Sequence, residues 1–350
     1  MWIKGCFETM TRYIRPLVQT GPARPCDAHT LAGGWCWFTH VEILSRTAAP
    51  SVVPVTGIEA GELAALVTER PAIAGLSFDG PRLMGILNVT PDSFSDGGRH
   101  QTLSGAVEES VRMVSKGADL IDIGGESTRP GAVAVAPEDE MQRTAPVIQA
   151  MRGAGVATPI SIDTRKSAVG RAAISAGANI VNDVSGFTYD LELAAICGKL
   201  GTPVCVMHAQ GDPVTMQDEP QYDDVLLDVY DFLGTQIDVL RSLGIQRSSI
   251  IADPGIGFGK SQSHNLKLLN RISLFHSLGV PILLGASRKR FIGNIGDEPV
   301  ADKRAAGSVG VALAAIGQGV QLIRAHDIVE HQQAIALWQA SVTQDLNEVE

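Results

Sequence analysis

The stretch MGILNVTPDSFSDGG (residues 84–98) joins an apolar segment to a loop of turn-forming residues. Residues 83–89 are apolar except for the amide of Asn88, which predicts a buried strand. Proline, aspartate, serine and a glycine pair follow at once, and these residues end regular structure. Polar groups at the carboxyl end of a strand are typical of a binding site, although an ordinary turn has the same composition. A binding site is favoured over an ordinary turn if the same pattern recurs along the chain.

The pattern does recur, because from residue 83 onward a short apolar strand followed by an amphipathic helix repeats eight times. The expected strands are residues 83–89, 120–124, 159–163, 180–184, 203–208, 250–253, 281–286 and 322–326. The expected helices lie near 103–116, 138–151, 167–176, 190–199, 222–243, 262–270, 302–317 and 328–341. Eight such units predict an α/β fold, a (β/α)8 TIM barrel. The alternative is a doubly wound open sheet, which carries a glycine fingerprint after its first strand, whereas here GIGFG (255–259) follows the sixth.

Residues 1–80 differ in composition from residues 81–350, which we assign to the barrel. Six prolines break the N-terminal segment into short pieces, and it holds three of the four tryptophans. Residues 35–43 alternate as a strand does, and residues 58–68 form at most a short amphipathic helix. Because tryptophan is too apolar to leave in water, we expect a small extension that docks at the N-terminal end or flank of the barrel. Its role is not evident from its residues.

The composition disfavours several classes of partner. The net charge is −10 with no basic cluster, which argues against nucleic acid and anionic lipid. No apolar run approaches the ~20 residues that a membrane span requires. The five cysteines lack paired C-x-x-C spacing and the N-terminus has no secretory leader, so a reducing cytoplasm is expected.

Polar residues follow nearly every expected strand. In a barrel the carboxyl ends of the strands meet at one mouth, so these residues are candidates for a shared site. One group offers acceptors, an amide and a cation between apolar walls: Asp163, Asn182, Asp253 and Lys289, with Met207 and Phe258. Such a pocket suits a flat, nitrogen-rich heterocycle, because carboxylates accept from its amine and ring N–H while the ammonium meets its carbonyl. Taken singly, each residue could instead cap a helix or be solvated.

A second group lies where the last and first strands become neighbours on closure of the barrel. Asn88 is a neutral oxygen ligand, and Arg324 and His326 are donors that can carry positive charge. Barrels often bind phosphate in this region. A diphosphate with Mg²⁺ fits, because Mg²⁺ prefers a few protein oxygens together with substrate phosphates and water. No histidine and cysteine cluster suggests zinc or iron.

Seven motifs in series resemble one enzyme family. They are MGILNVTPDSFSDGG, GADLIDIGGESTRPGA, PISIDTRKSAV, GANIVNDVSG, ADPGIGFGK, GASRKRFIG and IRAHD. In this order and spacing they resemble dihydropteroate synthase, the folate-pathway target of sulfonamides. The resemblance implies a transferase that joins 4-aminobenzoate to (7,8-dihydropterin-6-yl)methyl diphosphate, releases diphosphate and requires Mg²⁺. It also implies a homodimer formed through the late barrel helices.

The resemblance implies a role for each candidate residue. The first group corresponds to the pterin contacts and their walls. In the second group, Asn88 corresponds to the metal ligand and the two cationic residues to the diphosphate anchors. The 4-aminobenzoate side corresponds to Phe94, Thr128, Arg129, Pro130 and Ser287. The expected catalytic residues are Asp163, Asp253, Lys289 and Arg129, while Asp92 and Asp96 of the first loop have no clear role.

Two alternative functions are open. A methyltransferase with a pterin-binding barrel shares the DPG motif, but it needs neither diphosphate anchors nor the first-loop sequence NVTPDSFSDGG. A barrel that binds pterin without catalysis would not need the full set of residues at the mouth. Release of diphosphate that depends on both substrates and Mg²⁺ separates these alternatives from a synthase.

Overall fold

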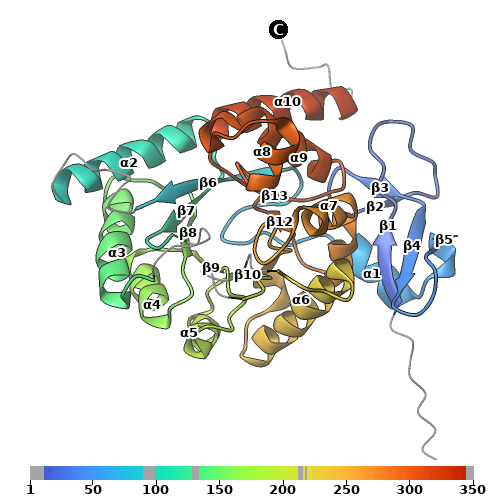
Figure 1. Cartoon of the computed structure of the whole chain (residues 1–350), viewed down its shortest axis with the longest axis horizontal. Coiled ribbons are helices and arrows are strands. Elements are labelled where there is room, and N and C mark those ends of the chain that lie inside the picture. The colour runs from blue at the N-terminus through green and yellow to red at the C-terminus, as the bar shows by residue number, and fades with distance from the viewer. Residues whose placement is uncertain (1–11, 90–98, 128–133, 212–215, 217–218, 344–350) are drawn as a thin grey trace, which may run out of the picture.

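The computed structural model describes residues 12–89, 99–127, 134–211, 216 and 219–343 (Figure 1). Among these residues, eight parallel strands form one sheet: β6 (Arg82–Asn88), β7 (Leu120–Gly124), β8 (Ile160–Asp163), β9 (Ile180–Asp183), β10 (Val204–Met207), β11 (Ile250–Asp253), β12 (Leu283–Leu284) and β13 (Leu322–Ala325). Their order is β11-β10-β9-β8-β7-β6-β13-β12. A parallel bridge between Ala252 and Ile282 joins the two ends of the sheet. The sheet therefore closes, and the predicted (β/α)8 barrel is confirmed.

Helices follow the strands and surround the barrel (Figure 1). They are α2 (Arg99–Ser115), α3 (Pro137–Gly153), α4 (Ser167–Ala176), α5 (Leu191–Leu200), α6 (Val225–Ser242), α7 (Gln262–Asn270), α8 (Arg290–Gly296), α9 (Ala305–Ile316) and α10 (Ile328–Thr343), with the 3₁₀ helices η3 (Arg247–Ser249), η4 (Ile272–Leu278) and η5 (Ala301–Lys303). Local chemistry sets their ends. The carboxylate of Asp224 caps α6 by accepting from the N–H of Leu226 at 2.9 Å, and α4 ends at Gly177 with φ +112°. The expected helix at 302–317 is shorter than predicted, and α8 was not predicted.

Apolar side chains fill the N-terminal end of the barrel. They come from seven of the strands and are each at most 1% exposed: Met84, Leu120, Ile180, Cys205, Ile251, Leu283 and Leu322. Ile73, Leu76 and Phe78 belong to the same cluster and precede the first barrel strand. These three residues close the floor of the barrel, so the packed unit begins before residue 81. The polar residues lie at the opposite end of the barrel, at the carboxyl ends of the strands.

The N-terminal extension forms small sheets of its own. β1 (Arg12–Pro16), β4 (His40–Ser45) and β5 (Ser51–Pro54) form an antiparallel sheet, and β2 (His29–Thr30) pairs with β3 (Trp37–Phe38). The 3₁₀ helix η1 (Val55–Gly57) and α1 (Ala60–Val67) follow. The expected single strand at 35–43 is wrong in detail, because β3 and β4 are separate strands that pair with different partners.

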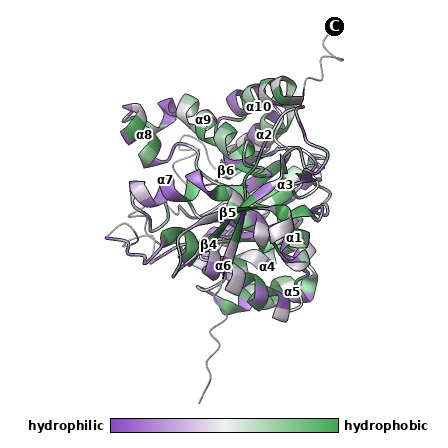
Figure 2. Cartoon of the chain, turned by 90° about the vertical axis from the view of Figure 1, so that its right-hand side faces the viewer, coloured by the Kyte–Doolittle hydropathy of each residue, from purple (hydrophilic) through white to green (hydrophobic). Residues whose placement is uncertain are grey.

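The extension docks on the flank of the barrel. The Tyr13 hydroxyl donates to Asp231 on α6 at 2.9 Å, and Arg46 forms ion pairs with Asp228 and Asp231, both at 2.7 Å. The indole N–H of Trp35 donates to the carbonyl of Ile316 at the end of α9, at 3.0 Å. Figure 2 shows β4, β5 and α1 on this side of the molecule, with α6 nearby.

Buried Arg70 connects the N-terminal extension to the barrel. It is 4% exposed, and its guanidinium donates to the carbonyls of Ala65 at 2.8 Å and His276 at 2.9 Å. These acceptors belong to α1 and η4, and cations are favoured near such carbonyls at helix ends. Burial lowers the pKa of Arg70 to about 10. The guanidinium therefore remains charged at neutral pH and fixes α1 against η4.

Two truncated chains separate the roles of the extension and the barrel floor. A chain that starts at Pro71 keeps Ile73, Leu76 and Phe78, whereas one that starts at Gly80 loses them. We expect the shorter chain to be less stable by roughly 3–6 kcal/mol, because burial of three large apolar side chains is lost. Urea unfolding of both chains measures this difference. A well-folded Pro71 chain without turnover would show that the extension contributes to the active site.

No helix in the described ranges combines the length and the hydropathy that crossing a bilayer requires.

Candidate active site

The residues predicted to bind a heterocycle lie at the carboxyl ends of neighbouring strands. Asp163 of β8 is in register with Asn182 of β9, and Met207 of β10 is in register with Asp253 of β11. Their exposed fractions are 7, 4, 3 and 5%, respectively. Because polar groups this deeply buried need partners, the contacts of each one decide what the site can bind.

Arg324 of β13 connects two carboxylates across the barrel. Its Nε donates to Asp122 Oδ2 at 2.6 Å, and its Nη2 donates to Asp163 Oδ2 at 2.9 Å. The amide of Asn182 donates to the same oxygen of Asp122 at 3.3 Å. Arg324, predicted to lie with the diphosphate anchors, thus also contacts the heterocycle side of the mouth.

Asp122 was missed by reasoning from sequence, although it is 0% exposed at the centre of the cluster. It lies within β7 and not after it, so a search for polar residues that follow strands passed over it. The available signal was a carboxylate inside the otherwise apolar segment LIDIG. A charge in a buried strand requires a partner, and here the partner comes from β13.

The cluster holds two acidic side chains and one guanidinium. Burial first, and then the neighbouring Asp122, raise the pKa of Asp163, while Arg324 opposes them. Burial alone would lower the pKa of Arg324, but the carboxylates of Asp122 and Asp163 outweigh burial and raise it. The upward shift favours the protonated form of Asp163 in the unligated protein, and a cationic ligand would favour its ionised form.

Asp253 lies next to a glycine-rich turn that bends back over the strands. Its Oδ1 accepts from the N–H of Gly255 at 2.7 Å. Burial raises the pKa of Asp253 to about 6, against the Gly255 hydrogen bond and the charge of Lys289. The ammonium of Lys289 lies 3.9 Å from the centroid of the Phe258 ring. The predicted cation and the predicted apolar wall are therefore in direct contact.

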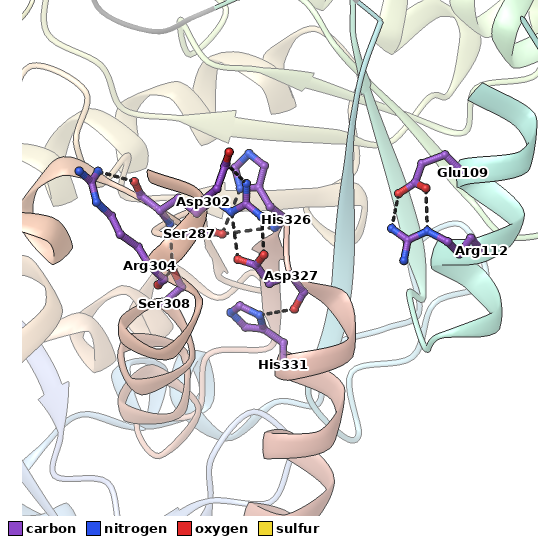
Figure 3. A network of polar contacts seen from close by, with 10 residues as sticks. Glu109, Arg112, Ser287, Asp302, Arg304, Ser308, His326, Asp327 and His331 are labelled. Carbon is purple, nitrogen blue, oxygen red and sulfur yellow. Dashed lines mark hydrogen bonds and ion pairs between the residues drawn. The ribbon is translucent and has the colours of Figure 1, made fainter. Parts of the chain in front are cut away.

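Ser287 and His326 connect the loops after β12 and β13 (Figure 3). Ser287 Oγ lies 3.0 Å from His326 Nδ1, and the backbone N–H of His326 donates to Ser287 Oγ at 3.2 Å. Arg288 forms an ion pair with Asp327 one residue further along each loop. Ser287 was predicted on the 4-aminobenzoate side and His326 on the diphosphate side. The structure brings these two residues into direct contact through both hydrogen bonds.

Asn88 lies at the end of β6, beside the carboxyl end of β7. A Cβ on Gly124 would lie 3.6 Å from Asn88 Oδ1 and 3.8 Å from Asp163 Cβ, so the absence of a side chain there leaves space between them. The described residues contain no group of three or more His, Cys, Asp or Glu side chains that could enclose a metal. A lone amide oxygen fits Mg²⁺, which takes its other ligands from water and phosphate.

Four predicted site residues, Phe94, Thr128, Arg129 and Pro130, lie outside the described residues, as do Asp92 and Asp96. The described ends of the second loop are held by Glu126 and Lys166. Glu126 Oε1 accepts from the N–H of Val135 at 2.9 Å, and its Oε2 accepts from Lys166 Nζ at 3.0 Å. Lys166 also donates to the carbonyl of Val135 at 2.8 Å. Lys166, which sequence reasoning did not select, thus holds residues 126 and 135 against the turn after β8.

The turn after β11 requires glycine at residue 255. Gly255 has φ +67°, and a Cβ there would lie 1.9 Å from the carbonyl oxygen of His208. We expect Gly255→Ala to lower the free energy of unfolding by about 3 kcal/mol or more, through left-handed strain and overpacking. Gly61→Ala is the control, because a Cβ there meets nothing within 4 Å. Equal midpoints of urea unfolding for the two variants would contradict this account.

Comparison with known proteins agrees with the geometry. The sequence matches the family described as pterin binding enzyme over residues 84–326. It is 44% identical to dihydropteroate synthase of Escherichia coli (strain K12) over 271 residues, covering 77% of this chain and 94% of that relative. It is also 44% identical to dihydropteroate synthase of Synechocystis sp. over 260 residues, covering 73% of this chain and 90% of the relative.

Solved structures give the same result. The chain resembles Xanthomonas albilineans dihydropteroate synthase with 4-aminobenzoic acid, with a TM-score of 0.72 and 45% identity over 78% of this chain and 97% of that one. It also resembles the X. albilineans enzyme in complex with 7,8-dihydropteroate, with a TM-score of 0.69 and 41% identity over 77% of this chain and 96% of that one. The predicted resemblance is confirmed: the chain belongs to the pterin-binding enzyme family and groups with its dihydropteroate synthases.

Proposed function

We propose that the mouth of this barrel condenses (7,8-dihydropterin-6-yl)methyl diphosphate with 4-aminobenzoate to give 7,8-dihydropteroate and diphosphate. The observation that carries the proposal is the buried cluster in which Arg324 connects Asp122 and Asp163. It combines a pocket for a nitrogen-rich ring with a guanidinium that can bind phosphate oxygens. The X. albilineans structures with 4-aminobenzoic acid and 7,8-dihydropteroate support the same substrates.

The pterin ring is held by hydrogen bonds that other rings cannot satisfy. Asp253 accepts from ring N–H and amino groups, Asn182 offers an amide, and Lys289 donates to the ring carbonyl. Met207 and Phe258 form the apolar walls. A ring without matching donors would leave these buried groups unpaired, which is the physical basis of selectivity.

The reaction proceeds by ionisation before attack. The bond between the methylene carbon and the diphosphate oxygen breaks, and its electron pair leaves with diphosphate. The resulting positive charge spreads over the dihydropterin ring, where Asp163 and Asp122 stabilise it as buried carboxylates. The lone pair of the 4-aminobenzoate nitrogen then forms the new C–N bond, and the nitrogen releases a proton. An aromatic amine is already neutral at neutral pH, so no strong base is required to activate it.

The diphosphate is bound by Arg324 and His326, and Asn88 offers the protein oxygen for Mg²⁺. When bound, Mg²⁺ neutralises negative charge that develops on the leaving group. On the 4-aminobenzoate side, Ser287 lies next to His326, so binding of the second substrate is adjacent to the leaving group. The roles of Phe94, Thr128, Arg129 and Pro130 on this side follow from the family motif.

The homodimer and the cytoplasmic location are also part of the proposal. Val329 and Leu337 on α10 are 46 and 72% exposed, which is consistent with association through the late barrel helices. Light scattering should give twice the mass of one chain. Within the described residues the cysteines, Cys26, Cys36, Cys197 and Cys205, are free thiols, and a reducing compartment would keep them so.

Product analysis tests the proposed reaction. With both substrates and Mg²⁺, the chain should form 7,8-dihydropteroate and diphosphate in equal amounts, as measured by mass spectrometry and a diphosphate assay. Omission of either substrate, or chelation of Mg²⁺, should stop both products. Diphosphate release at the same rate with and without 4-aminobenzoate, with no 7,8-dihydropteroate formed, would indicate hydrolysis and would contradict the proposal.

A further inference from the structure

Lys260 is a buried lysine to which the proposed reaction assigns no role. It ends the glycine-rich turn after β11 and is 2% exposed. Its Nζ lies 2.8 Å from His208 Nδ1, 3.3 Å from the carbonyl oxygen of His208 and 3.0 Å from the carbonyl oxygen of Phe258. An ammonium has three N–H donors, so these acceptors can use all of them. Burial lowers the pKa of Lys260 to about 7, and the charge of Asp253 opposes this shift.

The contact defines the state of His208. While Lys260 is an ammonium it can only donate, so in that state His208 Nδ1 accepts and the neutral ring carries its proton on Nε2. Burial first, and then the charge of Lys260, lower the pKa of His208 to about 2. The ring packs edge-on against Phe232, with centroids 4.9 Å apart. The His208 ring is therefore neutral at physiological pH.

Lys260 lies where two loops of the mouth touch. His208 follows β10, and Phe258 lies in the turn after β11. A Cβ on Gly255 would lie 1.9 Å from the carbonyl oxygen of His208, and a Cβ on Gly259 would lie 2.3 Å from that of Gln210. The two loops thus pack backbone against backbone, and Lys260 hydrogen-bonds to both.

The hydrogen bonds of Lys260 also connect it to residues of the proposed pterin pocket. Lys260 binds the carbonyl oxygen of Phe258, and the ring of Phe258 lies 3.9 Å below the ammonium of Lys289. A Cβ on Gly257 would lie 3.1 Å from Lys289 Cδ, so the turn also packs against the stem of Lys289. Displacement of this turn would therefore move the wall and the cation together.

We infer that Lys260 is a positioning residue for the pterin pocket. It fixes the turn after β11 to the end of β10, so that Phe258 and Lys289 are in place before the ligand arrives, and it does not contact the pterin itself. This inference rests on the proposed role of Phe258 and Lys289 as pterin contacts. Preorganisation of this kind improves affinity by reducing the cost of ordering on binding.

Lys260→Met tests the inference, because methionine keeps an unbranched side chain without its donors and charge. Calorimetry with (7,8-dihydropterin-6-yl)methyl diphosphate should show affinity weakened ten- to a hundredfold in the folded variant. The ¹⁵N spectrum of His208 should change in the unligated protein, because Nδ1 loses its donor. The matched control is Lys267→Met, which removes a lysine of α7 that is 40% exposed and pairs with Asp224 at 3.0 Å.

Lys260→Gln covers the case in which the methionine variant does not fold, since its amide restores N–H donors without charge. It should bind the diphosphate ester more tightly than Lys260→Met where both fold, and more weakly than the wild type. Wild-type affinity, within twofold, in a folded Lys260 variant would overturn the assignment, as would an equal loss in Lys267→Met. Failure of the wild type to bind the diphosphate ester would instead refute the proposed function, and this inference with it.

Discussion

Arg324→Ala should lower kcat/KM at least a thousandfold, which corresponds to about 4 kcal/mol of transition-state stabilisation. The guanidinium donates to Asp122 and Asp163, and in the proposed mechanism it also binds the leaving diphosphate. Removal of one partner of a buried ion pair costs roughly 3–5 kcal/mol, because the remaining charge is left uncompensated. Steady-state kinetics of diphosphate release measures the loss.

The control for Arg324→Ala removes a guanidinium from the surface. Arg112 on α2 is 59% exposed and pairs with Glu109 at 2.6 Å (Figure 3). Because exposed pairs contribute little, Arg112→Ala should keep activity within twofold of the wild type. Circular dichroism establishes whether Arg324→Ala is folded. A folded variant with more than a tenth of wild-type activity would show that the cluster is not central to catalysis.

Asp253→Asn should affect binding and stability in opposite directions. Loss of the charged acceptor should weaken pterin binding by about 2–4 kcal/mol, because buried groups lose their partner. The unligated protein should nevertheless become more stable above pH 6. Burial raises the pKa of Asp253 from 3.8 to about 6 in the folded protein, so the folded state binds the proton more tightly than the unfolded state. Wild-type stability is therefore lost as the pH rises through 6.

The size of this effect follows from the shift of the pKa. Each pKa unit corresponds to about 1.4 kcal/mol, so ionisation of Asp253 should cost the wild type roughly 2–3 kcal/mol between pH 4 and pH 8. Asparagine does not ionise, so the free energy of unfolding of Asp253→Asn should not fall in this way between pH 4 and pH 8. Urea unfolding at pH 4 and pH 8 should show that the advantage of Asp253→Asn appears only at the higher pH. Asp238→Asn, at a side chain that is 70% exposed, is the control. A pH-independent difference would show that ionisation of Asp253 is not the cause.

The barrel could be predicted from sequence because its strands are short, mostly apolar segments that recur at a regular spacing and must be buried on both faces. Its less regular parts could not. The strand expected at 281–286 is present but contains only Leu283 and Leu284, and α8 has the sequence RFIGNIG, where two glycines weaken any helical signal. In the extension, residues 35–43 alternate like one strand, but the chain changes partner between Phe38 and His40. Choice of strand partner is a tertiary property that local pattern does not encode.

The same limit applies to the site. Residues that directly follow a strand were found, because the barrel places all strand ends at one mouth. Asp122 and Lys260 were missed, because one lies inside a strand and the other ends a turn. Their importance depends on side chains brought from distant parts of the chain: Arg324 for Asp122, and His208 for Lys260. Such contacts require the closed barrel and cannot be inferred from spacing.

In the proposed reaction, one side of the mouth holds the pterin ring and the other side holds the diphosphate. The most direct measurement compares two ligands in His326→Ala by calorimetry: (7,8-dihydropterin-6-yl)methyl diphosphate and the corresponding 6-hydroxymethyl compound, which lacks the diphosphate. We predict that the diphosphate ester loses at least tenfold in affinity while the affinity of the alcohol stays within twofold. Equal losses for both ligands, or no loss for either, would contradict this claim.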